Sequence, residues 1–190
     1  MGLDMFMYKA EKPQLNPQKR YTHASLEKEG FVIFEAKEEL PDKLLDLKRF
    51  LVKVTVPAQY YNVEKIQKDF NLHEVPHWSG FGPDGYYFSS SHPEDKSVTI
   101  PDQDMPQYLV TRDGTFWITK LTEVGYWRKE YDLQDKIHTL YKRQLIRNCG
   151  YYRLTKAQLT SIDAFCRKHD LEIFEWEPED VGSLFYHEWY

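Results

Sequence analysis

A period-two alternation of side chains at the start of the chain and near its middle is the feature that most constrains the fold. The clearest case is the Leu-Val-Lys-Val-Thr-Val run at residues 51–56, which predicts a strand ended by Pro57. Residues 1–10 predict a second strand with two different faces. Its apolar face consists of Leu3, Met5 and Met7. Its aromatic-rich face consists of Asp4, Phe6 and Tyr8. Alternation of this kind requires a sheet.

Other segments add shorter strands and helices without a regular β-α-β order. Further strands are expected at residues 31–36, 85–89, 97–100, 171–177 and 183–190, with a hairpin over 107–120 that turns at Arg112-Asp113-Gly114. Helices are expected at 40–50, 63–70 capped by Asn62, 126–145, and 155–170 with a Thr155/Gln158 capping box. Gly150 is a candidate left-handed stop, and residues 11–30 predict an exposed loop. The order predicts an α+β fold with a mixed, mostly antiparallel sheet and two C-terminal-half helices packed on it.

The length of 190 residues favours a single domain, residues 1–190. Residues 71–107 are rich in Gly, Pro, Ser, Asp and His and show little periodicity, so they are expected to form a loop-rich insertion.

The aromatic content is high, with 14 Tyr, 11 Phe and 5 Trp. Large rings suit a packed core, and Tyr and Trp also suit a surface that grips a partner. The two cysteines, Cys149 and Cys166, have no metal-ligand spacing and form no disulfide framework, which favours a reduced, intracellular compartment. The first ten residues do not resemble a signal peptide, and no apolar run is long enough to predict a membrane span.

Charge is unevenly distributed along the chain. Residues 120–156 hold nine Lys and Arg against four acidic residues, whereas residues 170–190 hold seven acidic residues and no Lys or Arg. Either the two segments pack together and neutralise each other, or one of them contacts a partner.

The block Glu-Val-Gly-Tyr-Trp-Arg-Lys, residues 123–129, has two interpretations. As the start of a helix, it would pack Trp127 on the sheet, pair Glu123 with Arg128 and leave Lys129 solvated. As a site, it would use its charged and aromatic side chains to bind an anionic or aromatic partner.

Motifs for catalysis and cofactor binding are weak. Cys149 next to Gly150, with His138 eleven residues earlier, is disfavoured as a nucleophile because a helix C-terminus opposes a thiolate. The Gly-Phe-Gly-Pro-Asp-Gly run at residues 80–85 has the letters of a dinucleotide loop without its strand and helix. Five residues of the 71–107 tract are of metal-ligating types but match no known spacing: His73, Glu74, His77, Asp84 and His92. No catalytic residue, metal or cofactor is therefore predicted, and an enzyme is disfavoured.

Four features together resemble a family of small, uncharacterised phage and prophage proteins. These are the initial Met-Gly-Leu-Asp-Met, the residue 123–129 block, Asn-Cys-Gly-Tyr-Tyr at 148–152, and the aromatic, acidic end. The resemblance covers residues 1–10 and about 115–190. In that family the helix after the block often holds an Ile-His pair, which Ile137 and His138 match, although Thr139, Leu140 and Tyr141 replace its usual Trp-Phe-Val. The resemblance implies a viral origin and a cytoplasmic location in the host cell.

Three functions follow as hypotheses. The preferred one is an accessory protein that inhibits a host or anti-phage defence protein by binding it, as anti-CRISPR proteins do. The alternatives are a small nucleotide- or anion-binding protein or enzyme using the residue 123–129 block, and nucleic-acid binding through the basic helix, which the pI near 5.8 disfavours. The oligomeric state stays open. The candidate binding residues are Glu123, Tyr126, Trp127, Arg128, Lys129, His138, Glu175, Glu177, Glu179 and Asp180.

Overall fold

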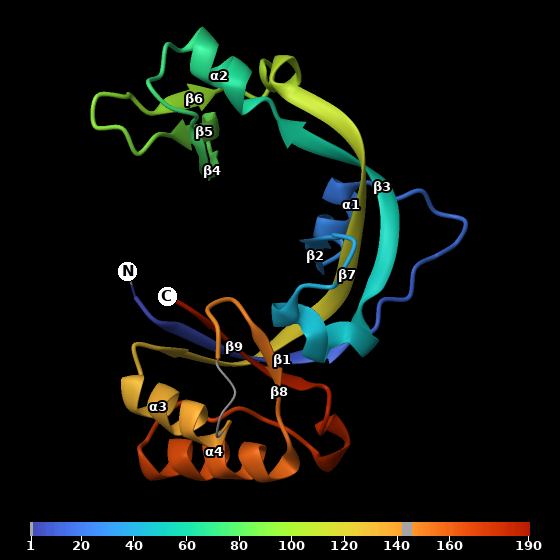
Figure 1. Ribbon diagram of the computed structural model, residues 1–190, viewed down its shortest axis with the longest axis vertical. Helices are drawn as coiled ribbons and strands as arrows, with labels where there is room; N and C mark the ends of the chain where they lie inside the picture. Colours follow the sequence, from blue (N-terminus) through green and yellow to red (C-terminus); the bar gives the residue numbers. More distant parts are fainter. Residues whose placement is uncertain (1, 142–145) are drawn as a thin grey trace. The chain divides into compact units, whose positions relative to one another are not determined.

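The computed structural model describes residues 2–141 and 146–190 (Figure 1). The chain divides into two compact units: Met1–Tyr21, Ser25–Thr55 and Thr115–Tyr190 form the first, and Thr22–Ala24 and Val56–Gly114 the second. The sequence predicts one domain with an insertion at about 71–107, and that whole insertion falls within the second unit.

The first unit is built on an antiparallel sheet with strand order β2-β7-β1-β9-β8, and β3 also pairs with β7. The strands are β1 (Asp4–Glu11), β2 (Phe31–Glu35), β3 (Val52–Tyr61), β7 (Leu109–Arg128), β8 (Tyr151–Arg153) and β9 (Leu184–Trp189). The division between the units falls within β3 and β7, so residues 56–61 and 109–114 of these strands belong to the second unit. The helical segments of the same region are α1 (His23–Lys28), the 3-10 helix η1 (Asp42–Phe50), α3 (Tyr131–Leu140), α4 (Lys156–Lys168) and η3 (Pro178–Asp180). The predicted α+β class is confirmed.

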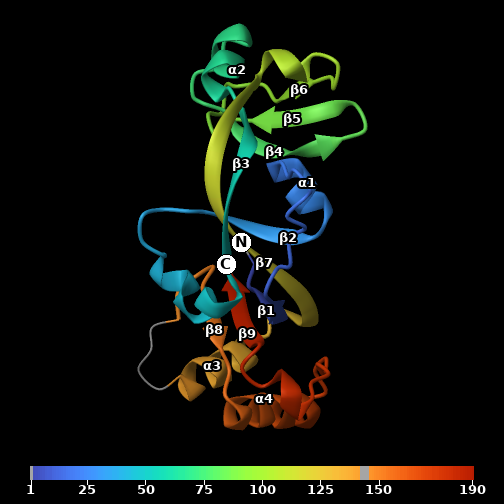
Figure 2. The ribbon, with the colours of Figure 1, turned by 90° about the vertical axis from the view of Figure 1, so that its right-hand side faces the viewer.

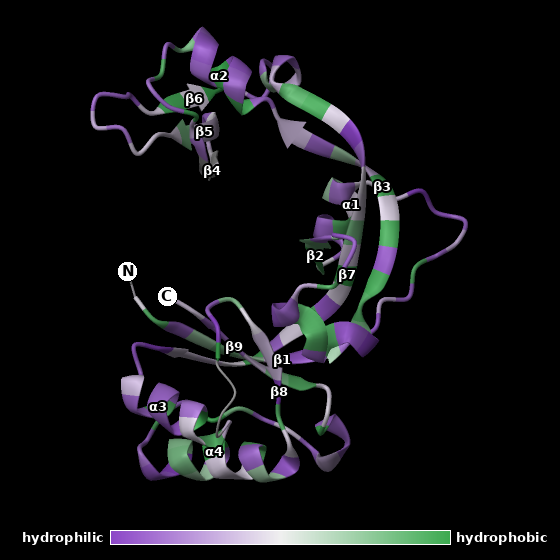
Figure 3. Ribbon diagram, viewed as in Figure 1, coloured by the Kyte–Doolittle hydropathy of each residue, from purple (hydrophilic) through white to green (hydrophobic). Residues whose placement is uncertain are grey.

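Helices α3 and α4 cover one face of this sheet (Figures 1 and 2). Green and purple segments alternate along both helices in Figure 3, as expected of amphipathic helices with one face in the core. The apolar side of β1 packs against them, because Leu3, Met5 and Met7 are all buried in the same cluster as Leu133 and Ile162. The predicted alternation of β1 and the packing of two C-terminal helices on the sheet are therefore confirmed.

The start of α4 is also as predicted. The Thr155 side chain accepts a hydrogen bond from the Gln158 amide, and the Gln158 side chain accepts one from the Thr155 amide, which completes a capping box. The helix predicted over 126–145 begins later, at Tyr131, and its predicted residues 142–145 lie outside the described part of the chain.

The residue 123–129 block does not begin a helix. Residues 123–128 are the last six of β7, and Lys129 then turns the chain with a left-handed φ of 59°. The Lys129 amide donates to the Leu3 carbonyl at 2.9 Å, which extends the pairing with β1 by one residue. The helical interpretation was wrong because alternation continues to the end of the block: Trp127 is buried, and its neighbour Arg128 is exposed.

The predicted hairpin at Arg112-Asp113-Gly114 is also wrong, because β7 runs through it as one 20-residue strand. A two-residue hairpin turn needs positive φ angles, and none of these three residues has one. Likewise, β3 continues through Pro57 to Tyr61. Proline is tolerated there because, among the described strands, β3 pairs only with β7 and so lies at a sheet edge.

Three further expectations need correction. Residues 171–177 form no strand, because Leu171, Phe174 and Trp176 all pack on the α3–α4 core, which is incompatible with a period of two. The left-handed residue before β8 is Cys149, with φ of 61°, rather than Gly150. The expected loop at 11–30 contains α1, and the helix expected at 40–50 is the 3-10 helix η1.

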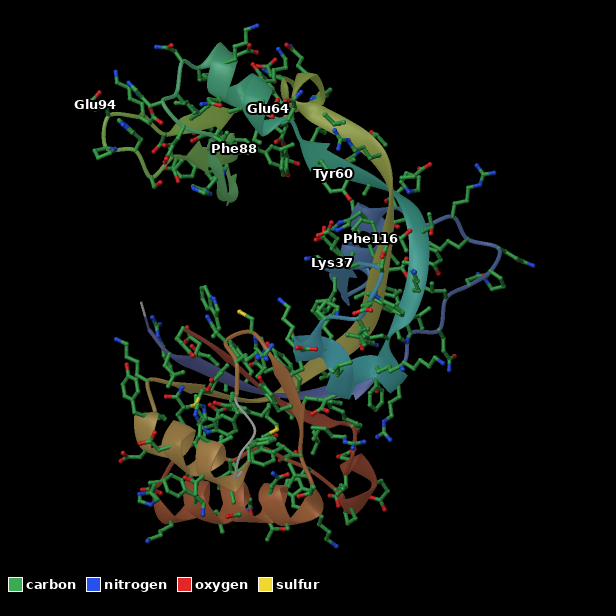
Figure 4. The ribbon with its side chains drawn as sticks, in the orientation of Figure 1. Lys37, Tyr60, Glu64, Phe88, Glu94 and Phe116 are labelled. Carbon is green, nitrogen blue, oxygen red and sulfur yellow. The ribbon has the colours of Figure 1, made fainter. Side chains whose placement is uncertain are left out.

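The second unit has a three-stranded antiparallel sheet, β4-β5-β6. Its elements are α2 (Val63–Asp69), β4 (His77–Gly82), β5 (Gly85–Ser89), β6 (Val98–Ile100) and the 3-10 turn η2 (Met105–Gln107). The strands predicted at 85–89 and 97–100 are confirmed as β5 and β6. The Asn62 cap is also confirmed, since the Asn62 side chain accepts a hydrogen bond from the Lys65 backbone amide at 2.9 Å. Phe88, labelled in Figure 4, is fully buried with Ile66 and Ile100.

Within residues 2–141 and 146–190, no helix combines the length and apolar character needed to cross a bilayer.

Gly125, in the residue 123–129 block, is required by close packing. A Cβ atom at this position would lie 2.9 Å from the Phe174 Cβ and 3.1 Å from the Trp127 ring. We expect Gly125→Ala to lower the free energy of unfolding by about 1–3 kcal/mol, the usual cost of overpacking a core. Urea denaturation measures this change. Gly82→Ala is the matched control, because its Cβ would meet a single atom at 3.9 Å; equal effects of the two substitutions would contradict the assignment.

Candidate functional site

The sheet of the first unit has a second face, opposite α3 and α4, which is partly uncovered. Directly paired residues on antiparallel strands point to the same face, so the register identifies its side chains. Tyr126 pairs with Phe6, Phe6 with His187, and His187 with Tyr151. These four residues form a line of rings across β7, β1, β9 and β8, here called the aromatic row.

The rings of the aromatic row are in continuous contact. Centroid distances are 5.1 Å from Tyr126 to Phe6, 5.8 Å from Phe6 to His187, and 4.4 Å from His187 to Tyr151. The last pair is stacked, with an interplanar angle of 20°. All four residues are half-buried, so one side of the row remains in solvent.

One long edge of the aromatic row carries a polar and strongly exposed group of residues. The next register positions are Arg128 opposite Asp4 and Asp4 opposite Trp189. The Tyr126 hydroxyl donates to Asp4 Oδ1 at 2.5 Å, and Arg128 Nε lies 3.7 Å from the same oxygen. The Arg128 side chain is 65% exposed and Trp189 is 57% exposed, so both are available to a partner.

The other long edge of the row is closed. Tyr8 lies two residues after Phe6 and so on the same face of β1, and the register shift between Met7 and Tyr8 brings Glu123 of β7 opposite it. Burial, together with the nearby Glu123 charge, raises the pKa of Tyr8 to about 12, so Tyr8 stays a neutral phenol. Beyond it, η1 covers the sheet: Phe50 packs edge-on against the buried Phe185 at 5.7 Å.

The imidazole of His187 is held as part of the row. Its Nδ1–H donates to the Gly150 carbonyl at 3.0 Å, which fixes the ring orientation. Burial lowers the pKa of His187 below its ordinary value, although the bond to Gly150 works in the opposite direction. The row is therefore a neutral, largely apolar strip at neutral pH.

The predicted residues of the 123–129 block separate onto both faces. Glu123, Tyr126 and Arg128 lie on the uncovered face, whereas Trp127 is buried in the core and donates its Nε1–H to the Glu172 carbonyl at 2.9 Å. Lys129 is exposed after the end of the strand.

His138 belongs to a different cluster, on the helix-covered side. Its Nε2 lies 3.0 Å from Glu188 Oε2, an oxygen that also accepts from the Gln134 amide and from the Tyr186 hydroxyl. Glu188 is fully buried. His138 thus holds a buried carboxylate in the core and makes no pair with Cys149, whose Sγ lies 3.6 Å from Asn148 Oδ1.

The acidic tail residues do not gather at the aromatic row. Glu175, Glu177 and Glu179 are exposed on the segment before β9. Asp180 pairs with Lys9 at 2.5 Å, on the helix-covered face of β1. Lys9 lies outside residues 120–156, the basic segment that the sequence offered for charge neutralisation. This ion pair therefore does not join the acidic segment to the basic one.

Three residues of this face are absent from every candidate site that the sequence offers: Phe6, His187 and Trp189. The signal was present, because the alternation that buries Met5 and Met7 places Phe6 on the other side. The pairing of β9 between β1 and β8 brings His187 and Tyr151 together, and that pairing has no sequence signature.

No protein-family model, curated protein or solved structure matches this chain.

The pKa of His187 leads to a pH prediction. Because the folded state lowers this pKa, the unfolded state binds more protons below about pH 6.5, the ordinary histidine value. We therefore expect the difference in the free energy of unfolding between the wild type and His187→Gln to shift against the wild type as pH drops from about 6.5. Above this pH the difference should be constant. Chemical denaturation of both proteins across this range tests it, and parallel pH profiles would show that His187 titrates normally.

Proposed function

We propose that this chain is a phage-encoded accessory protein that binds another protein through the uncovered sheet face. The observation that carries the proposal is the exposed pair Arg128 and Trp189 at the edge of the aromatic row. Tyr, Trp and Arg are the residues most enriched in the energetic centres of protein interfaces. A rigid sheet also presents them at little entropic cost.

The charges of this face favour a protein partner over a nucleic acid. Arg128 and Arg153 lie at register positions on this face, and so do Asp4 and Glu123, so the cations are balanced. A nucleic-acid groove needs an excess of positive charge along its length. In α3, Lys136 is accompanied by Asp132 and Asp135, while Lys142 and Arg143 of the predicted basic helix lie outside the described residues.

The family resemblance gives the proposal its biological setting. A viral accessory protein with an exposed binding face is suited to occupy the functional surface of a host or defence-system protein in the host cytoplasm. Inhibition by occupation needs no catalytic group, which is consistent with the neutral, apolar character of the row.

A second candidate function uses the same face. Aromatic rings beside an arginine suit a planar anionic ligand such as a nucleotide, whose base would stack on the rings and whose phosphate would pair with Arg128. Thermal stability measured with a panel of nucleotides separates the two: a rise in the midpoint that Arg128→Glu abolishes supports the nucleotide, and no rise supports the protein partner.

The main test is affinity capture from a lysate of bacteria with active defence systems. We expect one stoichiometric protein to be captured, and the double variant Arg128→Glu/Trp189→Ala to reduce its retention at least about tenfold, the loss typical of interface hot spots. Both side chains are exposed, so the variant should remain folded.

The matched control changes the other charged surface. Glu175→Lys/Glu177→Lys/Glu179→Lys alters three exposed side chains of the acidic segment and should leave capture unchanged. Capture that survives the Arg128/Trp189 variant and fails with the acidic-segment variant would transfer the binding surface to residues 175–179.

A further inference from the structure

A group of potential metal ligands lies in the second unit, away from the aromatic row. The described residues contain one such group, formed by His73, His92 and Glu94, whose ligand atoms all lie within 4.8 Å of one another. His73 comes from the segment after α2, and the other two come from the loop between β5 and β6, where Figure 4 labels Glu94. His77 and Asp84, which the sequence also offers, are not members of the group.

We propose that His73, His92 and Glu94 bind a divalent transition-metal ion, with Zn²⁺ as the preferred ion. Two imidazoles and a carboxylate are a ligand set that zinc uses when it keeps a fourth position open. The nitrogen ligands disfavour Mg²⁺ and Ca²⁺, which prefer oxygen ligands.

A buried carboxylate holds the His73 ring in a fixed orientation. Its Nδ1 lies 2.7 Å from Asp95 Oδ1, and the Asp95 side chain is only 1% exposed. The same carboxylate accepts from the backbone amides of His73 at 2.8 Å and Glu74 at 3.4 Å, so its position is fixed. A buried carboxylate that accepts the Nδ1–H of a histidine directs the Nε2 lone pair outward, as in the outer shell of many zinc sites.

The Glu94 carboxylate approaches the other ring nitrogen of His73. Its Oε2 lies 3.7 Å from His73 Nε2. When Asp95 holds the proton of His73 on Nδ1, the neutral ring carries a lone pair on Nε2. This lone pair faces the Glu94 carboxylate oxygen, and neither group has a proton to donate to the other. A cation between them satisfies both at once. A proton on Nε2 is the competing explanation, which metal titration distinguishes.

His92 completes the set after one side-chain rotation. Its ring stacks on that of His73 at 4.5 Å with an interplanar angle of 9°, and parallel rings cannot both hold one metal in their planes. The ring is half-buried, and its Nδ1 accepts a long bond from the Glu94 backbone amide, 3.4 Å. Rotation about its side-chain torsions gives up the stack on His73 and this long bond, and it brings a ring nitrogen toward the ion.

The fourth position would face a cavity. A pocket of about 470 Å³ is lined in part by His73, Glu94 and Asp95 and continues along Phe70 and Thr99. Water or an oxygen or nitrogen donor of a small ligand could occupy the open position from this side. The ion would also join the segment after α2 to the β5–β6 loop, so metal binding should stabilise the unit against unfolding.

The test uses the full chain stripped of metal with a chelator. Titration with Co²⁺ as a spectroscopic substitute should produce visible absorption bands of a low-coordinate site at one equivalent. Zn²⁺ should displace the cobalt and raise the midpoint of thermal unfolding. Absence of a one-equivalent cobalt site in the wild type would overturn the proposal without any variant.

Three variants locate the site. His92→Gln should abolish the cobalt bands, and Asp95→Asn should weaken zinc binding by about 10–100-fold, the usual effect of removing an outer-shell partner. The matched control His77→Gln changes an exposed histidine of the same unit outside the group and should bind like the wild type. Cobalt bands that persist in His92→Gln and disappear in His77→Gln would place the metal elsewhere.

Discussion

The pairing of β1 between β7 and β9 is the constraint on which the first unit depends. Because side chains alternate along the strand, this register sends Met5 and Met7 into the α3–α4 core and Phe6 to the opposite face. Burying each of these methionines contributes about 1.5–3 kcal/mol. A slip of one residue would exchange the two faces, exposing the methionines and burying Asp4. The core therefore fixes the position of the surface rings.

The same constraint explains why the uncovered face is preorganised. Its central rings belong to four different strands, yet their order is set by backbone pairing and by contacts such as the 4.4 Å stack of His187 on Tyr151. In β7, Gly125 leaves room for the buried Trp127 ring in the core. The register shift beside Gly125 places Glu123 next to Tyr8 on the uncovered face. The proposed binding surface and the hydrophobic core are thus two sides of one sheet.

The sequence predicted what local periodicity and capping determine. The alternation of β1, the Asn62 cap and the Thr155 capping box were all identified, because each depends on residues close together in the chain. The long strand β7 was missed because Asp113-Gly114 looks like a turn and long-range pairing overrides it. Tyr126 and Arg128 were identified as site residues, whereas His187 and Trp189 were not. Only the long-range pairing of β1 with β9 places His187 and Trp189 on the same face as Tyr126 and Arg128.

The central claim is that the face bearing the aromatic row meets a protein partner, and side-chain footprinting of the captured complex tests it most directly. Hydroxyl radicals oxidise accessible aromatic side chains, and mass spectrometry locates the modified residues. If this face meets the partner, Tyr126 and Trp189 lose reactivity in the complex while Phe165, on α4 across the sheet, keeps it. Protection of Phe165 with unchanged reactivity at Trp189 would contradict the account.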